Sequence, residues 1–198
     1  MLGNLLATAL HKTYDFSGKV IIIGAGASGL AAAKVLEKNN IQDYLVEIGG
    51  DFIWKGKNPK KEAWTIALTD PHNKTTPLGV LKLNDFKGQG GALSTSGNYQ
   101  QFFTDSLTGK KFHHIIDPST AFPSQDVFGS TVICPSSLVA DYSSTELMIL
   151  GNTMFNKWSN RKDTKNCQVI LTDSNAKIFT YGAPLLTLRN KKRKIHKL

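Results

Sequence analysis

The segment "STVICPSSLVADYSSTELMILG", residues 130–151, decides the fold class because it joins a strand to a long helix. The apolar, β-branched run Ser130–Cys134 predicts a strand, and residues from Ala140 to about Trp158 predict a helix. The only other substantial helix lies far away, near the N-terminus, and the strands come in adjacent pairs. This arrangement predicts an α+β fold rather than an alternating parallel sheet.

Three oxygen-bearing side chains stand at the start of this helix: Asp141, Ser144 and Thr145. Because Asp141 and Thr145 are one turn apart, they share a face of the helix. A carboxylate with hydroxyl oxygens suits Mg²⁺, which prefers oxygen ligands and keeps waters and phosphate oxygens in its shell. The alternative is that Asp141 only caps the helix.

Toward the N-terminus, "VIIIGAGASGLAAAK" forms a second strand-to-helix junction. Val20–Ile23 predicts a strand, and a helix is expected from about Ser28 to Asn39. Between them, the spacing of Gly24, Gly26 and Gly29 is that of a dinucleotide-binding turn, where a pyrophosphate lies on the helix N-terminus.

The surroundings of this glycine loop leave two interpretations open. Glu47, which ends the expected strand Tyr44–Ile48, is suitably placed to bind a ribose hydroxyl, so the motif is locally complete. However, no series of βα units follows Gly50, as a doubly wound fold requires. The loop therefore belongs either to an oxidoreductase fragment or to a strand–turn–helix element inside another fold.

Shorter elements are expected between the two helices and after the second one. Phe52–Lys55 and Trp64–Thr69 are predicted to pair with each other, and Leu78–Leu83 is another strand. "KGQGGALSTSGNYQQFF" predicts a loop that enters a short helix. A final hairpin in "NCQVILTDSNAKIFTYG" turns at Asp173-Ser174-Asn175.

The net charge of +9 is concentrated at the C-terminus, since residues 189–198 hold six basic residues and no acid. Such a tail could contact nucleic acid or an anionic membrane. Our interpretation is a solvated, mobile terminus, with no nucleic-acid partner for the body of the protein.

The two cysteines, Cys134 and Cys167, have neither zinc-site spacing nor the pattern of a disulfide framework, so both are interpreted as small buried hydrophobes. No apolar run reaches the roughly 20 residues of a membrane span, so stable membrane insertion is not expected. No secretory signal is visible, which favours the cytoplasm.

From Asp43 onward the sequence resembles the ApbE family of FAD:protein FMN transferases, through five segments in the family's order. The segments are "YLVEIGGDFIWKGKNP", "WTIALTDP", "STSGNYQQFF", "FHHIIDPSTAFP" and "STVICPSSLVADYSSTELMILG". The terminal hairpin fits the family too, and together these parts cover roughly residues 43–185. The resemblance implies a T-fold-related α+β domain with a mixed, largely antiparallel sheet and two main helices. Members of this family are often exported.

The resemblance further implies an activity: Mg²⁺-dependent transfer of FMN from FAD to a Ser or Thr hydroxyl of an acceptor protein, with release of AMP. Positioning and charge neutralisation dominate such chemistry. His114 is the expected proton acceptor, because imidazole exchanges protons near neutrality, and His113 is the second choice. Tyr99, Phe102 and Phe103 are expected to pack in the core, or alternatively to stack on the flavin ring.

The family pattern assigns the remaining site residues. Asp15 and the backbone at Ile115 would contact FAD, and Gly18, Asp141, Ser144 and Thr145 would offer metal ligands. The glycine loop replaces the family's own nucleotide-contacting turn here. Ser119 and Ala121 stand where a basic residue and glycine are usual, and alanine disfavours a positive φ.

Family proteins are usually longer, so we expect one ApbE-like domain over residues 1–188 that lacks the family's N-terminal part, followed by the basic tail 189–198. Besides transferase activity, two alternatives remain open. The domain could hold FAD or FMN without transferring it, or the glycine loop could belong to an oxidoreductase.

Overall fold

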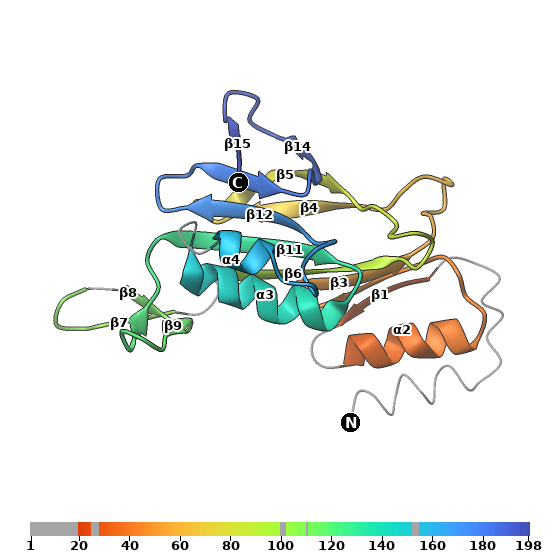
Figure 1. The fold of residues 1–198 in the computed structure, drawn as a ribbon, viewed down its shortest axis with the longest axis horizontal. Helices are drawn as coiled ribbons and strands as arrows, with labels where there is room; N and C mark the ends of the chain where they lie inside the picture. Colours follow the sequence, from red (N-terminus) through yellow and green to blue (C-terminus); the bar gives the residue numbers. More distant parts are fainter. Residues whose placement is uncertain (1–19, 25–27, 100–101, 110, 152–154) are drawn as a thin grey trace.

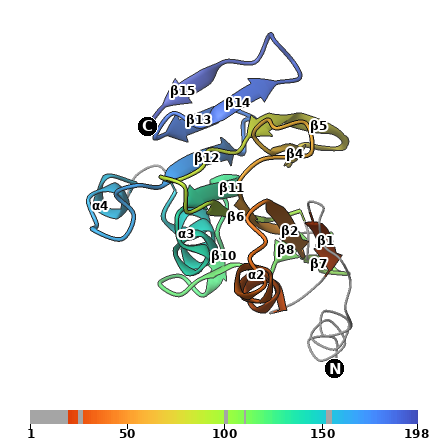
Figure 2. The same cartoon turned by 90° about the vertical axis from the view of Figure 1, so that its right-hand side faces the viewer.

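A computed structural model describes residues 20–24, 28–99, 102–109, 111–151 and 155–198. At the centre of the fold is an eight-stranded, largely antiparallel sheet (Figure 1). Helices α2 (Ser28–Lys38) and α3 (Ser137–Leu150) lie on one face of this sheet, and a three-stranded sheet lies on the other (Figure 2). The predicted α+β class, with two main helices, is therefore confirmed.

The strands of the central sheet run in the order β1–β2–β3–β6–β11–β12–β13–β15. Among the described strands, the pairs β1–β2 and β13–β15 are parallel and all the other ladders of this sheet are antiparallel. Their bounds are Val20–Gly24, Tyr44–Ile48, Asp51–Lys55, Gly91–Gly97, Val127–Cys134, Gln168–Asp173, Ile178–Tyr181 and Ile195–Lys197.

The strand–helix–strand unit expected near the N-terminus is present. β1 and β2 pair in parallel at one edge of the sheet, and α2 connects them. Leu36 of α2 is fully buried against Tyr44 and Val46 of β2. In the part of the chain that the structure describes, no second unit of this kind follows, so the glycine loop opens a single βαβ element within an antiparallel sheet.

The second sheet covers the face of the central sheet opposite α3. The sequence predicted that Phe52–Lys55 pairs with Trp64–Thr69, and this prediction is wrong: β3 pairs with β2 and β6, whereas β4 pairs with β5. Trp54 and Trp64 belong to the apolar layer between the two sheets. The bounds of β4, β5 and β14 are Thr65–Asp70, Asn73–Lys82 and Leu185–Leu188.

The largest difference from the sequence prediction is β6, which was expected to be a loop entering a helix. Residues Gly91–Gly97 instead form a central strand between β3 and β11. Because side chains alternate along a strand, Leu93 faces the second sheet while Ala92 and Ser94 face α3. The strand is buried on both faces by segments that are distant in sequence.

Two small hairpins follow β6 and extend beyond the central sheet (Figure 1). They are the pairs β7–β8 and β9–β10. The bounds of these strands are Phe102–Thr104, Lys111–His113, Ile116–Asp117 and Phe122–Pro123. The predicted final hairpin is confirmed, with β12 and β13 joined at residues 174–177.

Helix α3 is shorter than predicted. It ends at Leu150, and Gly151 adopts φ 60° and ψ −160°, a conformation open essentially to glycine alone. A separate short helix, α4 (Phe155–Ser159), follows and carries Trp158. The helix predicted to run to Trp158 is therefore two helices. None of the helices in the described ranges is long and apolar enough to cross a bilayer.

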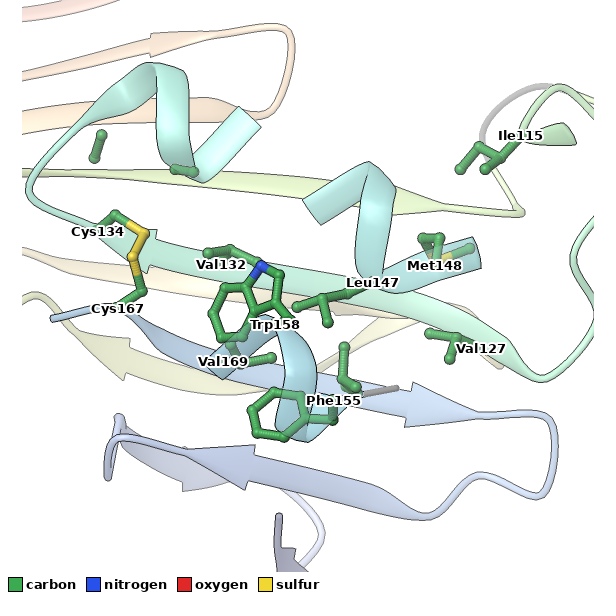
Figure 3. Packing of buried hydrophobic residues seen from close by; sticks show 13 residues of the cluster. Ile115, Val127, Val132, Cys134, Leu147, Met148, Phe155, Trp158, Cys167 and Val169 are labelled. Carbon is green, nitrogen blue, oxygen red and sulfur yellow. A yellow bond between two sulfur atoms is a disulfide. The ribbon is translucent and has the colours of Figure 1, made fainter. Parts of the chain in front are cut away.

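Helices α3 and α4 cover a core of apolar side chains on β11 and β12. Leu147, Phe155 and Trp158 pack there against Val132 and Val169 (Figure 3). Cys134 and Cys167 lie in the same cluster and form a disulfide (Figure 3). The prediction that both cysteines are buried is confirmed, but the expectation of no disulfide is wrong, because neighbouring strand ends bring the two sulfurs together.

The basic C-terminal segment is not the mobile terminus that the sequence predicted. Ile195–Lys197 form β15, which pairs in parallel with β13 and is the edge strand of the sheet. Before it, the guanidinium of Arg193 lies 2.7 Å from the carboxylate of Asp70 and donates to the carbonyl of Ala176. The segment is thus anchored by strand pairing and by one ion pair.

Candidate active site

The candidate site lies where the first turns of α3 cross β6. Ser136 is the N-cap of the helix: its Oγ accepts a hydrogen bond from the Val139 N–H at 3.4 Å. The interpretation that Asp141 caps the helix is therefore wrong. Asp141 and Thr145 are both exposed and one turn apart, so the carboxylate and the hydroxyl are available on one face of the helix.

Ser144 differs from its two neighbours because its side chain is fully buried between α3 and β6. Its hydroxyl donates to the Asp141 carbonyl at 2.9 Å and lies 2.8 Å from Ser96 Oγ. A longer contact of 3.3 Å joins it to Ser94 Oγ. The hydroxyl is thus committed inside the helix–sheet interface, where it anchors the helix that carries Asp141 and Thr145.

The structure adds an acidic residue that the sequence analysis missed. Asp51, at the start of β3, accepts a hydrogen bond from the Thr95 N–H at 3.4 Å. Burial raises the pKa of Asp51, and the nearby carboxylates of Asp141 and Glu47 raise it further. One feature of the sequence could have indicated Asp51: it directly follows Gly49-Gly50, and the turn at these glycines directs it toward β6.

Glu47 has a structural role in the same corner. Its Oε1 accepts a hydrogen bond from the Gly50 N–H at 2.9 Å and so closes the turn between β2 and β3. Both glycines of this turn have positive φ. The side chain expected to bind a ribose hydroxyl thus holds the turn that presents Asp51.

The donor set of this corner fits Mg²⁺. The side chains that reach solvent here are carboxylates and a hydroxyl, all hard oxygen donors. Within the described residues, no three His, Cys, Asp or Glu side chains are grouped closely enough to hold a metal by themselves. An ion at Asp141 and Thr145 would therefore complete its shell with waters or substrate oxygens, as Mg²⁺ commonly does.

The histidine loop lies near the other end of α3. Ile115 is buried in the same cluster as Val127 and Met148 (Figure 3). Met148 is seven residues beyond Asp141, which corresponds to about 10 Å along the helix axis. Ile115 thus packs against the C-terminal part of α3, whereas Asp141 lies in its N-terminal part.

The two histidines of this loop have different settings. His113 is buried; its Nε2 lies 2.6 Å from the Ser124 carbonyl, and its Nδ1 accepts a hydrogen bond from the Ile115 N–H at 3.3 Å. Both ring nitrogens are therefore used within the loop, which removes His113 as a proton acceptor. His114 is exposed in the bend between β8 and β9.

The Asp117 side chain holds the turn after His114. Its carboxylate accepts hydrogen bonds from the backbone and the hydroxyl of Ser119, and its carbonyl accepts from the Ala121 N–H at 2.8 Å. The Ser119 hydroxyl also lowers the pKa of Asp117. Ala121 adopts φ 58°, so the turn forms with a positive φ despite the missing glycine.

The aromatic residues after β6 do not all pack as predicted. Phe102 and Phe103 are exposed on β7, so the expectation of core packing is wrong for both. Phe103 stacks on Phe112 of β8, with ring centroids 5.2 Å apart. Tyr99 is half-buried and its ring covers Gly97.

The predicted residues of the N-terminal region are only partly described. Gly24 ends β1 and Gly29 lies in the first turn of α2. Asp15, Gly18 and Gly26 lie outside the described residues. Which nucleotide, if any, the glycine loop contacts therefore stays a prediction.

Comparison with known proteins connects this geometry to one family. The model of the ApbE family matches residues 18–171 of the chain. The FAD:protein FMN transferase of Haemophilus influenzae is 35% identical over 173 residues, which cover 85% of this chain and 47% of the relative. The protein of the same name from Klebsiella pneumoniae is 35% identical over 130 residues, 65% of this chain and 35% of the relative.

Solved structures show the same architecture. The ApbE protein from Thermotoga maritima superposes with a TM-score of 0.65 at 25% identity, over 77% of this chain and 47% of that protein. For the flavin transferase ApbE from Vibrio cholerae the TM-score is 0.59 at 26% identity, over 78% of this chain and 46% of that protein. The chain thus spans less than half the length of each of these proteins.

Proposed function

The chain belongs to the ApbE family, and from this premise we propose that it transfers FMN from FAD to a Ser or Thr hydroxyl of an acceptor protein. AMP is the other product, and Mg²⁺ is required. The observation that carries the proposal is the corner between α3 and β6, where exposed Asp141 and Thr145 share a helix face beside Asp51.

In this mechanism Asp141 and Thr145 would hold Mg²⁺. When the ion is bound, its positive charge would offset the negative charge of the FAD pyrophosphate. The acceptor hydroxyl oxygen forms a bond to the FMN phosphorus, and the bond from that phosphorus to the AMP phosphate oxygen breaks. His114 takes the proton that the hydroxyl loses. Ser144 holds the helix on the sheet, so that the two ligands keep their relative position.

The remaining predicted contacts belong to the same proposal. The proposed domain extends over residues 1–188, and the basic segment 189–198 adds β15 to its sheet; the acceptor is a protein rather than nucleic acid. We propose that FAD is bound with the help of Asp15, Gly24, Gly26, Gly29 and the backbone at Ile115, and that Gly18 offers a further metal ligand.

A test is incubation of the purified protein with FAD, with and without Mg²⁺, followed by chromatography of AMP and FMN. We expect Mg²⁺-dependent AMP release, and a loss of at least about 100-fold in Asp141→Asn, since removing charge stabilisation from a transfer site has effects of this order. Glu62→Gln removes one negative charge from an exposed loop and is the matched control.

A second proposed function is flavin binding without transfer. The same experiment separates the two. Retention of intact FAD without AMP release in any variant would support the binding module and contradict the transferase. Absence of both AMP release and FAD binding would contradict both.

A further inference from the structure

A chain of hydroxyl groups links β6 to the proposed metal ligand on α3. Thr145 Oγ1 lies 3.0 Å from Ser96 Oγ, and Ser96 Oγ lies 2.8 Å from Ser144 Oγ. Ser144 Oγ in turn donates to the Asp141 carbonyl at 2.9 Å. This series of hydrogen-bonded hydroxyl groups therefore begins at one proposed ligand, Thr145, and ends at the backbone of the other, Asp141.

The order of the protons in this chain follows from counting donors. Each hydroxyl has one proton, and the Asp141 carbonyl can only accept, so the proton of Ser144 is used there. Ser96 must then donate to Ser144, and the contact between Ser96 and Thr145 needs the proton of Thr145. This is the arrangement in which all three contacts are hydrogen bonds.

A neighbouring contact agrees with this order. The Ser94 hydroxyl lies near the Asp51 carboxylate and lowers its pKa. Because the proton of Ser144 is on the Asp141 carbonyl, Ser144 can only accept in its contact with Ser94. Their oxygens are 3.3 Å apart, the longest hydroxyl–hydroxyl contact in this corner.

We infer that Ser96 is a positioning residue: by accepting the proton of Thr145, it turns the lone pairs of Thr145 Oγ1 toward the cation that Asp141 holds. The inference rests on the proposed function, because it assumes a metal at Asp141 and Thr145. A hydroxyl binds a cation through a lone pair, so a fixed rotor favours binding. Groups that orient metal ligands commonly change metal affinity 10–100-fold.

The competing explanation is that Ser96 only docks α3 on the sheet, and the opposite face of β6 offers a matched control. Thr95 Oγ1 and Thr131 Oγ1 form a comparable hydroxyl pair at 3.0 Å, between β6 and β11. Ser96→Ala and Thr95→Val each remove one such hydroxyl from the same strand. We expect similar drops in thermal midpoint, measured by circular dichroism.

The test is Mn²⁺ binding to the full chain, measured from the electron paramagnetic resonance signal of free Mn²⁺. We expect Ser96→Ala to weaken binding about 10-fold and Thr95→Val to leave it unchanged. Ser96→Thr, which keeps the hydroxyl, should restore affinity. If Ser96 acts through Thr145, Ser96→Ala should add nothing further to a Thr145→Val variant.

The outcomes separate this inference from the proposed function. If Mn²⁺ binds and Asp141→Asn abolishes binding, the metal site stands. Equal affinities of Ser96→Ala and Thr95→Val would then overturn the positioning role alone, as would additive effects of Ser96→Ala and Thr145→Val. Mn²⁺ binding that is absent, or insensitive to Asp141→Asn, would overturn the proposed metal site and the role of Ser96 with it.

Discussion

Asp51 is a carboxylate held where its negative charge is unfavourable. Partial burial and the carboxylates of Asp141 and Glu47 all raise its pKa, whereas the nearby Ser94 hydroxyl and Thr95 N–H lower it. A nearby cation would relieve this repulsion. The same setting that makes the corner suitable for a cation therefore lowers the stability of the cation-free protein at neutral pH.

This cost has a definite pH dependence. Because the pKa of Asp51 is higher in the folded than in the unfolded protein, protonated Asp51 favours the folded state. This contribution to stability is complete below the pKa of the unfolded protein and is lost as pH rises through the pKa of the folded protein. We expect Asp51→Asn to raise the thermal midpoint in EDTA at pH 7 and to have less effect at pH 3. Thermal unfolding of both proteins across this range measures it; an equal effect at all pH values would contradict the assignment.

Ala121 and Ser96 show two ways in which the role of a single residue cannot be predicted from the sequence. Alanine at 121 was expected to disfavour the turn, yet the turn forms with φ 58°, closed by the bond to the Asp117 carbonyl. In the sequence, Ser96 is one serine in a polar stretch and carries no signal of its own. Its significance depends on α3, which lies on it only in the folded protein.

At the scale of elements, the break between α3 and α4 is set by one residue. Gly151 combines φ 60° with ψ −160°, and its N–H still bonds the Leu147 carbonyl at 3.1 Å. No atom lies closer than 4.0 Å to the position of an added Cβ, so backbone strain is the main obstacle to a side chain there.

We therefore expect Gly151→Ala to lower the free energy of unfolding by about 1–3 kcal/mol. Urea unfolding followed by tryptophan fluorescence measures the change, since Trp158 is buried in α4 beyond the break. Asn156→Ala, at an exposed position of α4, is the control and should not lower stability. Unchanged stability of Gly151→Ala would mean that the helix can continue past Leu150.

At the scale of the whole molecule, the disulfide joins the end of β11 to the start of β12 under helices α3 and α4. It closes a loop with a sequence separation of 33 residues, which contains the helix of the proposed metal site. Disulfides persist in oxidising compartments and are rare in reducing ones, so this pairing makes the stability of the domain depend on redox conditions.

Replacing both Cys134 and Cys167 by alanine should lower the free energy of unfolding by about 2–4 kcal/mol, mainly because the unfolded chain is no longer constrained. Guanidinium unfolding of the wild type, with and without reductant, gives the comparison. Reductant should destabilise the wild type and leave the double variant unchanged. If the wild type is unfolded completely with reductant and its free energy of unfolding equals the value without reductant, the disulfide pairing is contradicted.

The sequence by itself determined what depends on neighbours along the chain. The β1–α2–β2 unit, the β12–β13 hairpin and the helix carrying Asp141 and Thr145 follow from local patterns of apolar residues, glycines and turn residues. The family could also be identified, because its motifs are short contiguous segments. The α+β class followed from the order of these elements.

Only the tertiary structure decided what depends on contacts between distant segments. β6 is a strand because β3 and β11 flank it and apolar layers cover both faces, although its own residues resemble a loop. Cys134 and Cys167 pair because β11 and β12 are neighbours. Ser96 contacts α3, and Asp51 bonds to β6, for the same reason: the energy of these contacts comes from partners that no local pattern specifies.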